Sequence, residues 1–197
     1  MTMPYVLSAP TEGIGLLKQA LDYALATGQH ITADVLTAPT PCDRWDLATL
    51  LLHLNESLDA LQEGLREGCV GVMPTGPPAP DADLLFGFRS RACRLLHTCA
   101  MVCAPDQVRV GDWQLSLSTL AGIGAIEVAV HGWDVGRACG HPYPIPANLA
   151  EELLLLAPLV INDATRHSLF APPVSTPSTV PSDRLLALLG RDAAGRP

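Results

Sequence analysis

Basic residues are scarce in this sequence of 197 residues, and they do not cluster. Twelve Lys and Arg stand against twenty Asp and Glu, which gives a formal net charge of −8. A protein that binds nucleic acid needs a basic stripe that neutralises phosphates. The scattered positive charge therefore argues against a nucleic-acid partner.

Long apolar runs and a secretory signal are also lacking. The longest apolar stretches, such as LLLLAPLVI, are shorter than the about 20 residues that a helix needs to cross a bilayer. The opening MTMPYVLSAPTEG has neither the basic region nor the apolar core of a signal peptide. The six cysteines form no CxxC pair, and three of them fall in one predicted helix as small apolar residues. We therefore expect a cytoplasmic protein with reduced thiols and no membrane partner.

Aromatic residues make up only 5% of the chain, whereas Leu and Ala are prominent in an apolar content of 48%. Residues that favour strands are thus sparse, and strong helix formers are abundant. The length suits one domain with its own core. These features predict an all-α fold, with residues 1–197 as a single domain and residues 168–197 as an extended tail with a short helix.

Apolar residues recur at helical spacing in five long segments. We predict helices at 11–36, 47–66, 81–103, 118–138 and 148–166. Asp46 and Ser118 are the expected N-caps of the second and fourth helices. Four long helices with a long crossover predict a four-helix bundle, with the fifth helix and the tail packed on its outside.

The segments between these helices are less regular. GCVGVMPTGPPAP is predicted to be a loop on its composition. APDQVRVGDWQLSL shows a weak alternation that is typical of strands, which predicts either a short hairpin or an extended crossover. The Pro- and Ser/Thr-rich tail APPVSTPSTVPS should be an extended surface segment that leads into the short helix DRLLALLG.

The fourth predicted helix carries the most informative stretch, GAIEVAVHGWDVGRA. Glu127 and His131 are four residues apart, so they project from nearly the same face of the helix. Asp134 returns to that stripe seven residues after Glu127. An apolar helix should not bury these groups without partners, because uncompensated buried charge is costly. A divalent cation would be a suitable partner, since an imidazole and a carboxylate at this spacing can both coordinate it.

A third ligand is available in the second predicted helix. His53 lies in a row of leucines, LATLLLHLNES, and should point into the core. Across a bundle it would complete a two-His, one-carboxylate set with Glu127 and His131, and the positions left open are typical of catalytic sites. A plainer interpretation stays open, in which His53 is a hydrogen-bonded core residue and Glu127–His131 is a chance pair.

Other candidate ligands are weaker. Cys93 with His97, and Cys99 with Cys103, are also four residues apart, but their surroundings look like ordinary core. Glu56 is expected on a solvated helix face. The sequence contains no Gly-rich phosphate loop, no GxSxG motif and no dinucleotide-binding fingerprint.

Three segments resemble one known family. TPCDRWDLATLLLHL and EVAVHGWDVGRACG are similar to the entry into helix two and to the Glu-x3-His-Gly-Trp-Asp signature of the DinB-like superfamily, in its mycothiol-dependent maleylpyruvate isomerase N-terminal branch. FAPPVSTPSTVPSDRLLALLGRD resembles the ending of a large, mostly uncharacterised actinobacterial group within that branch. The resemblance spans most of the chain.

The resemblance implies an up-down-down-up four-helix bundle with a metal at one end. It also implies that His53, Glu127 and His131 are the ligands, with zinc as the expected ion and nickel as an alternative. Characterised isomerases of this branch use the thiol mycothiol and carry an additional C-terminal α/β domain, for which this chain is expected to have no room. We therefore expect metal and thiol chemistry without assigning maleylpyruvate as the substrate.

Three functions are compatible with these residues. The first is a metal-dependent transferase or isomerase that uses a mycothiol-type cofactor on a small electrophilic substrate, with Asp134 as the residue that orients a ligand or accepts a proton. The second is a non-catalytic bundle that binds metal or a small molecule, and the third is a structural domain. The apolar outer faces of the first and fifth helices would suit a homodimer.

Overall fold

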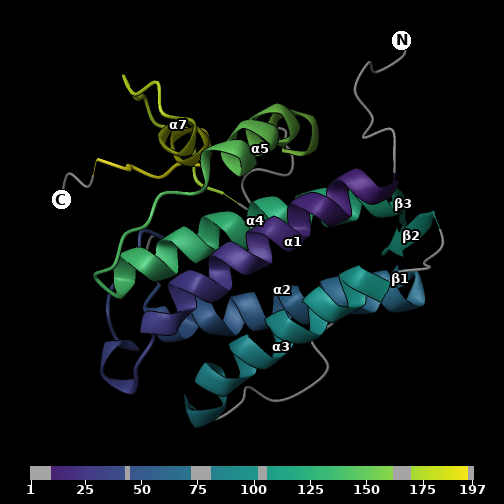
Figure 1. Cartoon of the computed structure of the whole chain (residues 1–197), viewed down its shortest axis with the longest axis horizontal. Helices are drawn as coiled ribbons and strands as arrows, with labels where there is room; N and C mark the ends of the chain where they lie inside the picture. The colour runs from purple at the N-terminus through teal and green to yellow at the C-terminus, as the bar shows by residue number, and fades with distance from the viewer. Residues whose placement is uncertain (1–9, 43–44, 72–80, 102–105, 162–169, 195–197) are drawn as a thin grey trace.

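The computed structural model describes residues 10–42, 45–71, 81–101, 106–161 and 170–194 (Figure 1). Helices account for most of this part of the chain, and one small sheet closes an end of the bundle. The α-helices are α1 (Pro10–Thr27), α2 (Leu47–Glu67), α3 (Asp81–Met101), α4 (Leu117–Ala138), α5 (Ala147–Val160) and α7 (Pro181–Leu188). The 3-10 turns are η1 (Gly28–His30) and η2 (Ala33–Val35), and the strands are β1 (Cys69–Val70), β2 (Gln107–Val110) and β3 (Trp113–Ser116).

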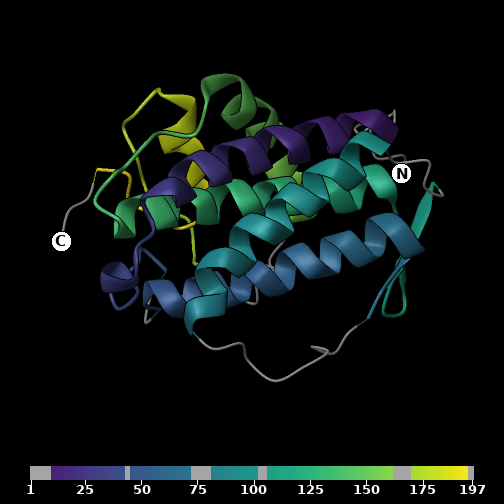
Figure 2. The same cartoon turned by 60° about the horizontal axis from the view of Figure 1, so that its bottom comes forward.

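Helices α1 to α4 form a four-helix bundle in up-down-down-up order. Helices α1 and α4 lie side by side and run in the same direction, as Figures 1 and 2 show. Helices α2 and α3 run antiparallel to α1 and α4 (Figures 1 and 2). They are parallel to each other: Asp59 of α2 pairs with Arg91 of α3, and further along both helices Gln62 bonds to Thr98. The all-α, DinB-like bundle predicted from the sequence is therefore confirmed.

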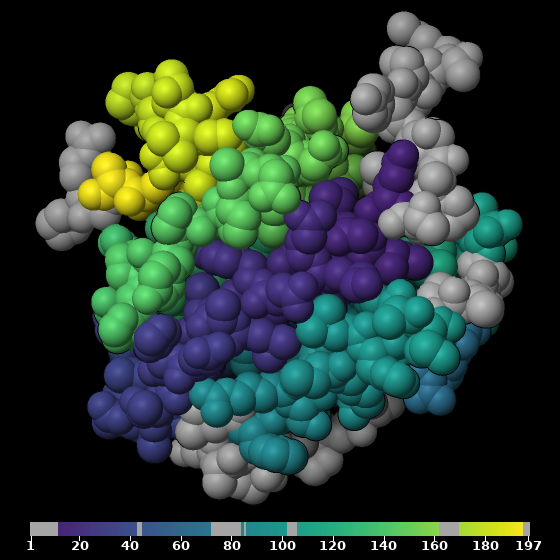
Figure 3. Space-filling view, viewed as in Figure 1, coloured from purple at the N-terminus to yellow at the C-terminus, as the bar shows by residue number. Residues whose placement is uncertain are grey.

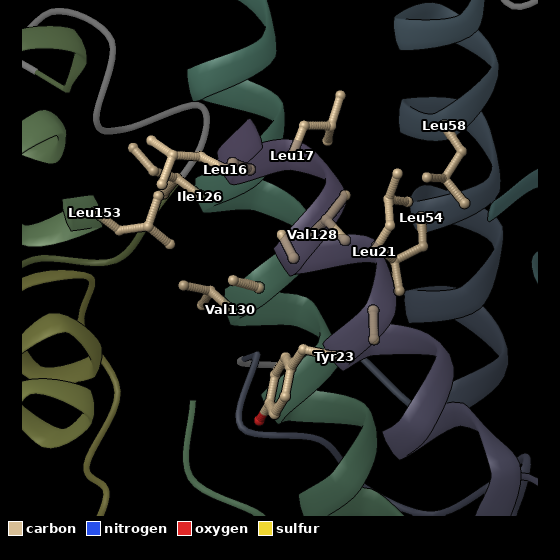
Figure 4. Close-up of a cluster of buried hydrophobic side chains, with 14 of the residues drawn as sticks. Leu16, Leu17, Leu21, Tyr23, Leu54, Leu58, Ile126, Val128, Val130 and Leu153 are labelled. Atoms are coloured by element: carbon tan, nitrogen blue, oxygen red, sulfur yellow. The ribbon is translucent and has the colours of Figure 1, made fainter. Parts of the chain in front are cut away.

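The core consists of aliphatic side chains on the facing sides of these helices (Figure 4). Leu17 and Leu21 of α1 pack with Leu54 and Leu58 of α2, and all four side chains are almost completely buried. Helix α4 is buried on nearly its whole circumference, since α1 and α2 cover it within the bundle and α5 covers it from outside. A helix that is apolar all round is typical of such a central position.

Helix boundaries differ from the prediction in two places. The first helix ends at Thr27, and the apolar residues beyond it reach the core from 3-10 turns and extended backbone, so Ile31 and Leu36 are buried without being α-helical. The cap of α4 is Ser116, whose side chain accepts the N–H of Thr119. The expected cap, Ser118, instead lies inside the helix.

Two further boundaries fall partly outside the described residues. Helix α5 ends at Val160, and the remainder of the helix predicted to residue 166 is not described. Helix α3 is described to Met101, so the end predicted at residue 103 is likewise not described. No helix in the described part of the chain combines the length and the apolar character needed to cross a bilayer.

The ambiguous segment 104–117 contains a hairpin. Strands β2 and β3 pair antiparallel, with Val108 opposite Leu115, and Gly111 with φ 56° forms the turn. Strand β1, in the segment predicted to be a loop, adds to β2 in parallel. A strand of two residues is too short to show a periodic pattern in the sequence. Its formation depends on pairing with β2 rather than on its own residues.

The C-terminal part of the chain covers one side of α4. Residues 170–180 form no helix or strand and lead into α7, which packs against α5 (Figure 3). Leu185, Leu186 and Leu189 are fully buried there. Gly190 follows with φ 80°, a left-handed conformation that glycine adopts without strain and that turns the next residue inward.

Candidate metal centre

Three side chains of types that can bind a metal converge from two helices, in the half of the bundle where α2 begins. Their nitrogen and oxygen atoms, from His53 of α2 and from Glu127 and His131 of α4, all lie within 4.8 Å of one another. The N-cap Asp46, which accepts the N–H of Thr49, fixes the start of α2 about two turns before His53. The structure thus brings together the three residues that the sequence singled out.

The two imidazoles meet at one carboxylate oxygen. Glu127 Oε1 lies 2.6 Å from His53 Nε2 and 3.2 Å from His131 Nε2. The side chain of His131 is 2% exposed and that of Glu127 12%, whereas that of His53 is 33% exposed. The group is therefore closed on the His131 side and accessible beside His53.

Asp134 lies behind His131, away from the other two ligating side chains. Its Oδ2 is 2.9 Å from His131 Nδ1, and its side chain is fully buried. Arg191 forms a second contact with the same carboxylate, through Nη2 to Oδ2 at 2.9 Å and Nε to Oδ1 at 3.4 Å. Because His131 Nδ1 faces a carboxylate, Nε2 is the ring nitrogen left for the site.

The buried charges shift one another's pKa values. Burial alone would lower the pKa of His131, but the Glu127 and Asp134 carboxylates outweigh it and raise that pKa to about 9. Burial would raise the pKa of both carboxyl groups, yet His131 and its hydrogen bonds hold the pKa of Glu127 and of Asp134 below their usual ranges. The metal-free site therefore carries a charged imidazole between two carboxylates at neutral pH.

This charge arrangement predicts how the stability of the metal-free protein depends on pH. The folded state binds the His131 proton more tightly than the unfolded state does, with a pKa raised from 6.5 to about 9. The resulting stabilisation, on the order of 3 kcal/mol, is fully present below pH 6.5 and is lost as the pH rises through about 9. Urea unfolding with a metal chelator, from pH 6 to pH 10, measures it.

The matched control for this measurement is His97→Ala, which removes an exposed histidine of α3. That variant should keep the pH dependence of the wild type, whereas His131→Ala should flatten the curve between pH 6.5 and 9. An equal loss of stability in wild type and His131→Ala over this range would contradict the charge arrangement.

Aromatic rings flank the three candidate ligands. The ring centroid of Trp45 is 5.0 Å from that of His53 and 6.3 Å from that of His131. Phe170 stacks at 6.4 Å from His131 on another side, and the His53 and His131 rings meet edge to face at 5.2 Å. These apolar neighbours restrict water around the imidazoles and favour ligand binding over hydration.

The chemistry of the donor set fits a divalent cation. Two imidazole nitrogens and one carboxylate oxygen are common ligands of Zn²⁺ and related ions, and three protein ligands leave coordination positions open. The Asp134 contact at His131 Nδ1 is the outer partner that metal-bound histidines usually have. His53, Glu127 and His131 are the residues that would hold the ion.

The weaker sequence candidates do not join this group. Glu56 is exposed, as expected for a solvated helix face. The surroundings of Cys93 and His97 were wrongly predicted to be core, because both residues are exposed on α3. Cys99 is buried, and burial raises its thiol pKa to about 11, while its predicted partner Cys103 lies outside the described residues.

Two residues near the site were missed by sequence reasoning. Phe170 and Arg191 come from the C-terminal part of the chain, and neither follows a periodic pattern that points to α4. The only signal was a basic residue directly after the glycine that ends the short apolar helix, LLALLGRD.

A second group of possible ligands, Glu63, Glu67 and Cys69, lies partly exposed at the end of α2. Exposed acidic groups of this kind are common without an ion.

Fold and side chains together define a helical-bundle protein with a candidate two-His, one-carboxylate centre. The chain belongs to the mycothiol maleylpyruvate isomerase N-terminal domain family, whose model matches residues 17–136. This range is more than half of the chain and includes His53, Glu127, His131 and Asp134. Arg191 lies beyond it.

Similar proteins come from mycobacteria. Two curated relatives from Mycobacterium tuberculosis, Uncharacterized protein MT0763 of strain CDC 1551 / Oshkosh and Uncharacterized protein Rv0738 of strain H37Rv, are each 28% identical over 186 residues. The similarity covers 88% of this chain and 94% of each relative. No solved structure matches the chain significantly.

Proposed function

We propose that this protein is a metal-dependent enzyme that uses a mycothiol-type thiol to transform a small electrophilic substrate, as a transferase or an isomerase. The observation that carries the proposal is the convergence of His53, Glu127 and His131 within 4.8 Å beside a partly open face. Family membership supports the thiol part, since the family takes its description from a mycothiol-linked isomerase. Zinc is the ion we favour for this donor set, and nickel is the alternative.

Each residue of the site has a distinct task in this proposal. His53 and His131 would coordinate the ion through Nε2, and Glu127 would supply the anionic ligand through Oε1. When bound, a divalent ion lowers the pKa of a coordinated thiol, so that thiolate is available at neutral pH. Trp45 and Phe170 would shield the imidazoles from water, and His53 borders the side through which thiol and substrate would enter.

Asp134 would act as a positioning residue. It is fully buried and bonded to His131 and Arg191, so a substrate beside His53 would not touch it. Of the two roles predicted for Asp134, orienting a ligand fits these contacts better than accepting a proton. The carboxylate would keep His131 Nδ1 protonated and its ring in one orientation.

Turnover assays on the zinc-loaded protein test the proposal. We expect conversion over many cycles per chain with one class of electrophile. A transferase would consume one mycothiol for each alkyl halide, forming the thioether and releasing halide, whereas an isomerase would convert maleylpyruvate and regenerate the thiol. His131→Ala should abolish turnover and His97→Ala should preserve it. Saturable thiol binding without conversion of any electrophile would instead support the non-catalytic binding protein.

A further inference from the structure

Arg191 connects the C-terminal segment to the interior of the candidate metal centre. It follows the turn at Gly190, and its side chain is 2% exposed. All three guanidinium nitrogens form hydrogen bonds. Nη2 and Nε donate to the two oxygens of Asp134, and Nη1 donates to the carbonyl of Leu189 at 2.9 Å. A guanidinium group held in this way has one orientation.

The surroundings of Arg191 favour this single arrangement. Its guanidinium carbon lies 5.6 Å from the centre of the Phe170 ring, which also stacks beside His131. The charge of Asp134 outweighs the burial of Arg191 and raises the pKa of the guanidinium. A buried carboxylate paired by two parallel contacts is both neutralised and fixed in its rotamer, which a single hydrogen bond does not achieve.

Asp134 is thereby held from one side by Arg191 and bonds His131 from the other. Its Oδ2 atom is shared between Arg191 Nη2 and His131 Nδ1, each at 2.9 Å. If Arg191 were absent, the carboxylate would be free to rotate, and its charge would depend on His131 alone. The imidazole would then lose the contact that keeps its Nε2 directed at Glu127.

We propose that Arg191 is a positioning residue of the metal centre, and that the C-terminal segment around α7 completes a site whose ligating residues all lie in the bundle. Arg191 acts through Asp134 and orients His131 for the ion. The proposal deepens the proposed function and rests on it for the metal, whereas the positioning of His131 is a property of the metal-free chain as well.

The first test is NMR of the metal-free protein with labelled histidine. At pH 7 the His131 Nδ1 proton should be protected from solvent exchange in the wild type, because it is bonded to Asp134 in a buried site. Arg191→Met should speed its exchange by at least about 10-fold. Arg184→Met, which changes an exposed arginine of α7, the short helix that precedes Arg191, should leave the exchange unchanged.

The second test is a double-mutant cycle on zinc affinity, measured by competition with a chromophoric chelator. Arg191→Met should weaken binding by about 10- to 100-fold, the range typical of changes to the outer partner of a ligand, because Arg191 fixes that partner, Asp134. In an Asp134→Asn background the same change should weaken binding by less than about 3-fold, because the group through which Arg191 acts is already altered. Arg191→Lys keeps the positive charge but cannot make both contacts to Asp134, so its zinc affinity should lie between those of the wild type and Arg191→Met.

The outcomes separate this proposal from the proposed function. A wild-type protein that binds neither zinc nor nickel overturns the metal-dependent function, while the His131 exchange measurement still decides whether Arg191 positions the ring. The positioning role is overturned if Arg191→Met leaves the His131 exchange unchanged, or if it lowers zinc affinity equally in the wild-type and Asp134→Asn backgrounds. Arg191 would then serve only to dock the C-terminal segment on the bundle. If Arg191→Met does not fold, Arg191→Lys is compared with the wild type by both measurements.

Discussion

Changing His131 to alanine is expected to leave the protein without bound metal. Wild-type protein, freed of its tag and reconstituted with zinc or nickel, should hold about one ion per chain by elemental analysis, as a single three-ligand site implies. The variant loses the best buried of the three proposed ligands and leaves a carboxylate and a partly exposed imidazole. Affinity should therefore fall by more than the about 10- to 100-fold typical of outer-partner changes.

His53→Ala should give the same loss through a different helix. Because His53 is the most exposed ligand, its removal disturbs packing less than removal of His131, so loss of metal in this variant points to coordination rather than to folding. His97→Ala is the matched control, since it removes an exposed histidine of α3 that has no part in the site. Its metal content should equal that of the wild type.

Absence of metal from the reconstituted wild type would contradict the metal-dependent function directly. His53, Glu127 and His131 would then be an internal ion-pair cluster, in which the carboxylate partners two imidazoles. The histidine and its carboxylates would stabilise the fold without an ion, as in the structural interpretation that the sequence left open. The pH dependence of unfolding would still be expected, since it arises in the metal-free protein.

Local patterns in the sequence were sufficient to predict the four-helix bundle. The leucines of α2 and the apolar face of α1 repeat at helical spacing, and burial of that face is what stabilises each helix. The same reasoning failed beyond Thr27, because Ile31 and Leu36 keep the apolar period while the backbone adopts 3-10 turns. Periodicity shows which residues are buried more reliably than it shows where a helix ends.

The candidate site was predictable where its geometry is local and missed where it is not. The spacing of Glu127 and His131 places both on one face of α4 from the helix geometry alone. Placing His53 beside these two residues also required the packing of the second helix against the fourth, and the helical pattern predicted such a bundle. Arg191 is 57 positions from Asp134 in the sequence, and only the docking of the C-terminal segment brings the two together.

The contact between α1 and α4 gives the second large expected effect. The backbone N–H of Gly13 donates a hydrogen bond to Ser118 Oγ at 3.1 Å, and a Cβ at this position would lie 2.0 Å from the Ser118 carbonyl oxygen. Since that oxygen belongs to the backbone, Gly13→Ala must move the start of α1 and the start of α4 apart. We expect the free energy of unfolding to fall by about 2 kcal/mol, even after the gain in helix propensity.

Gly15, two residues further along α1, is the matched control because it is equally helical but faces open space. A Cβ there meets nothing within 4 Å, so Gly15→Ala should raise the free energy of unfolding by about 0.5–1 kcal/mol. Urea unfolding of the two variants beside the wild type should therefore give changes of opposite sign. If both alanines stabilised the protein, the close approach of α1 to α4 at Gly13 would be wrong.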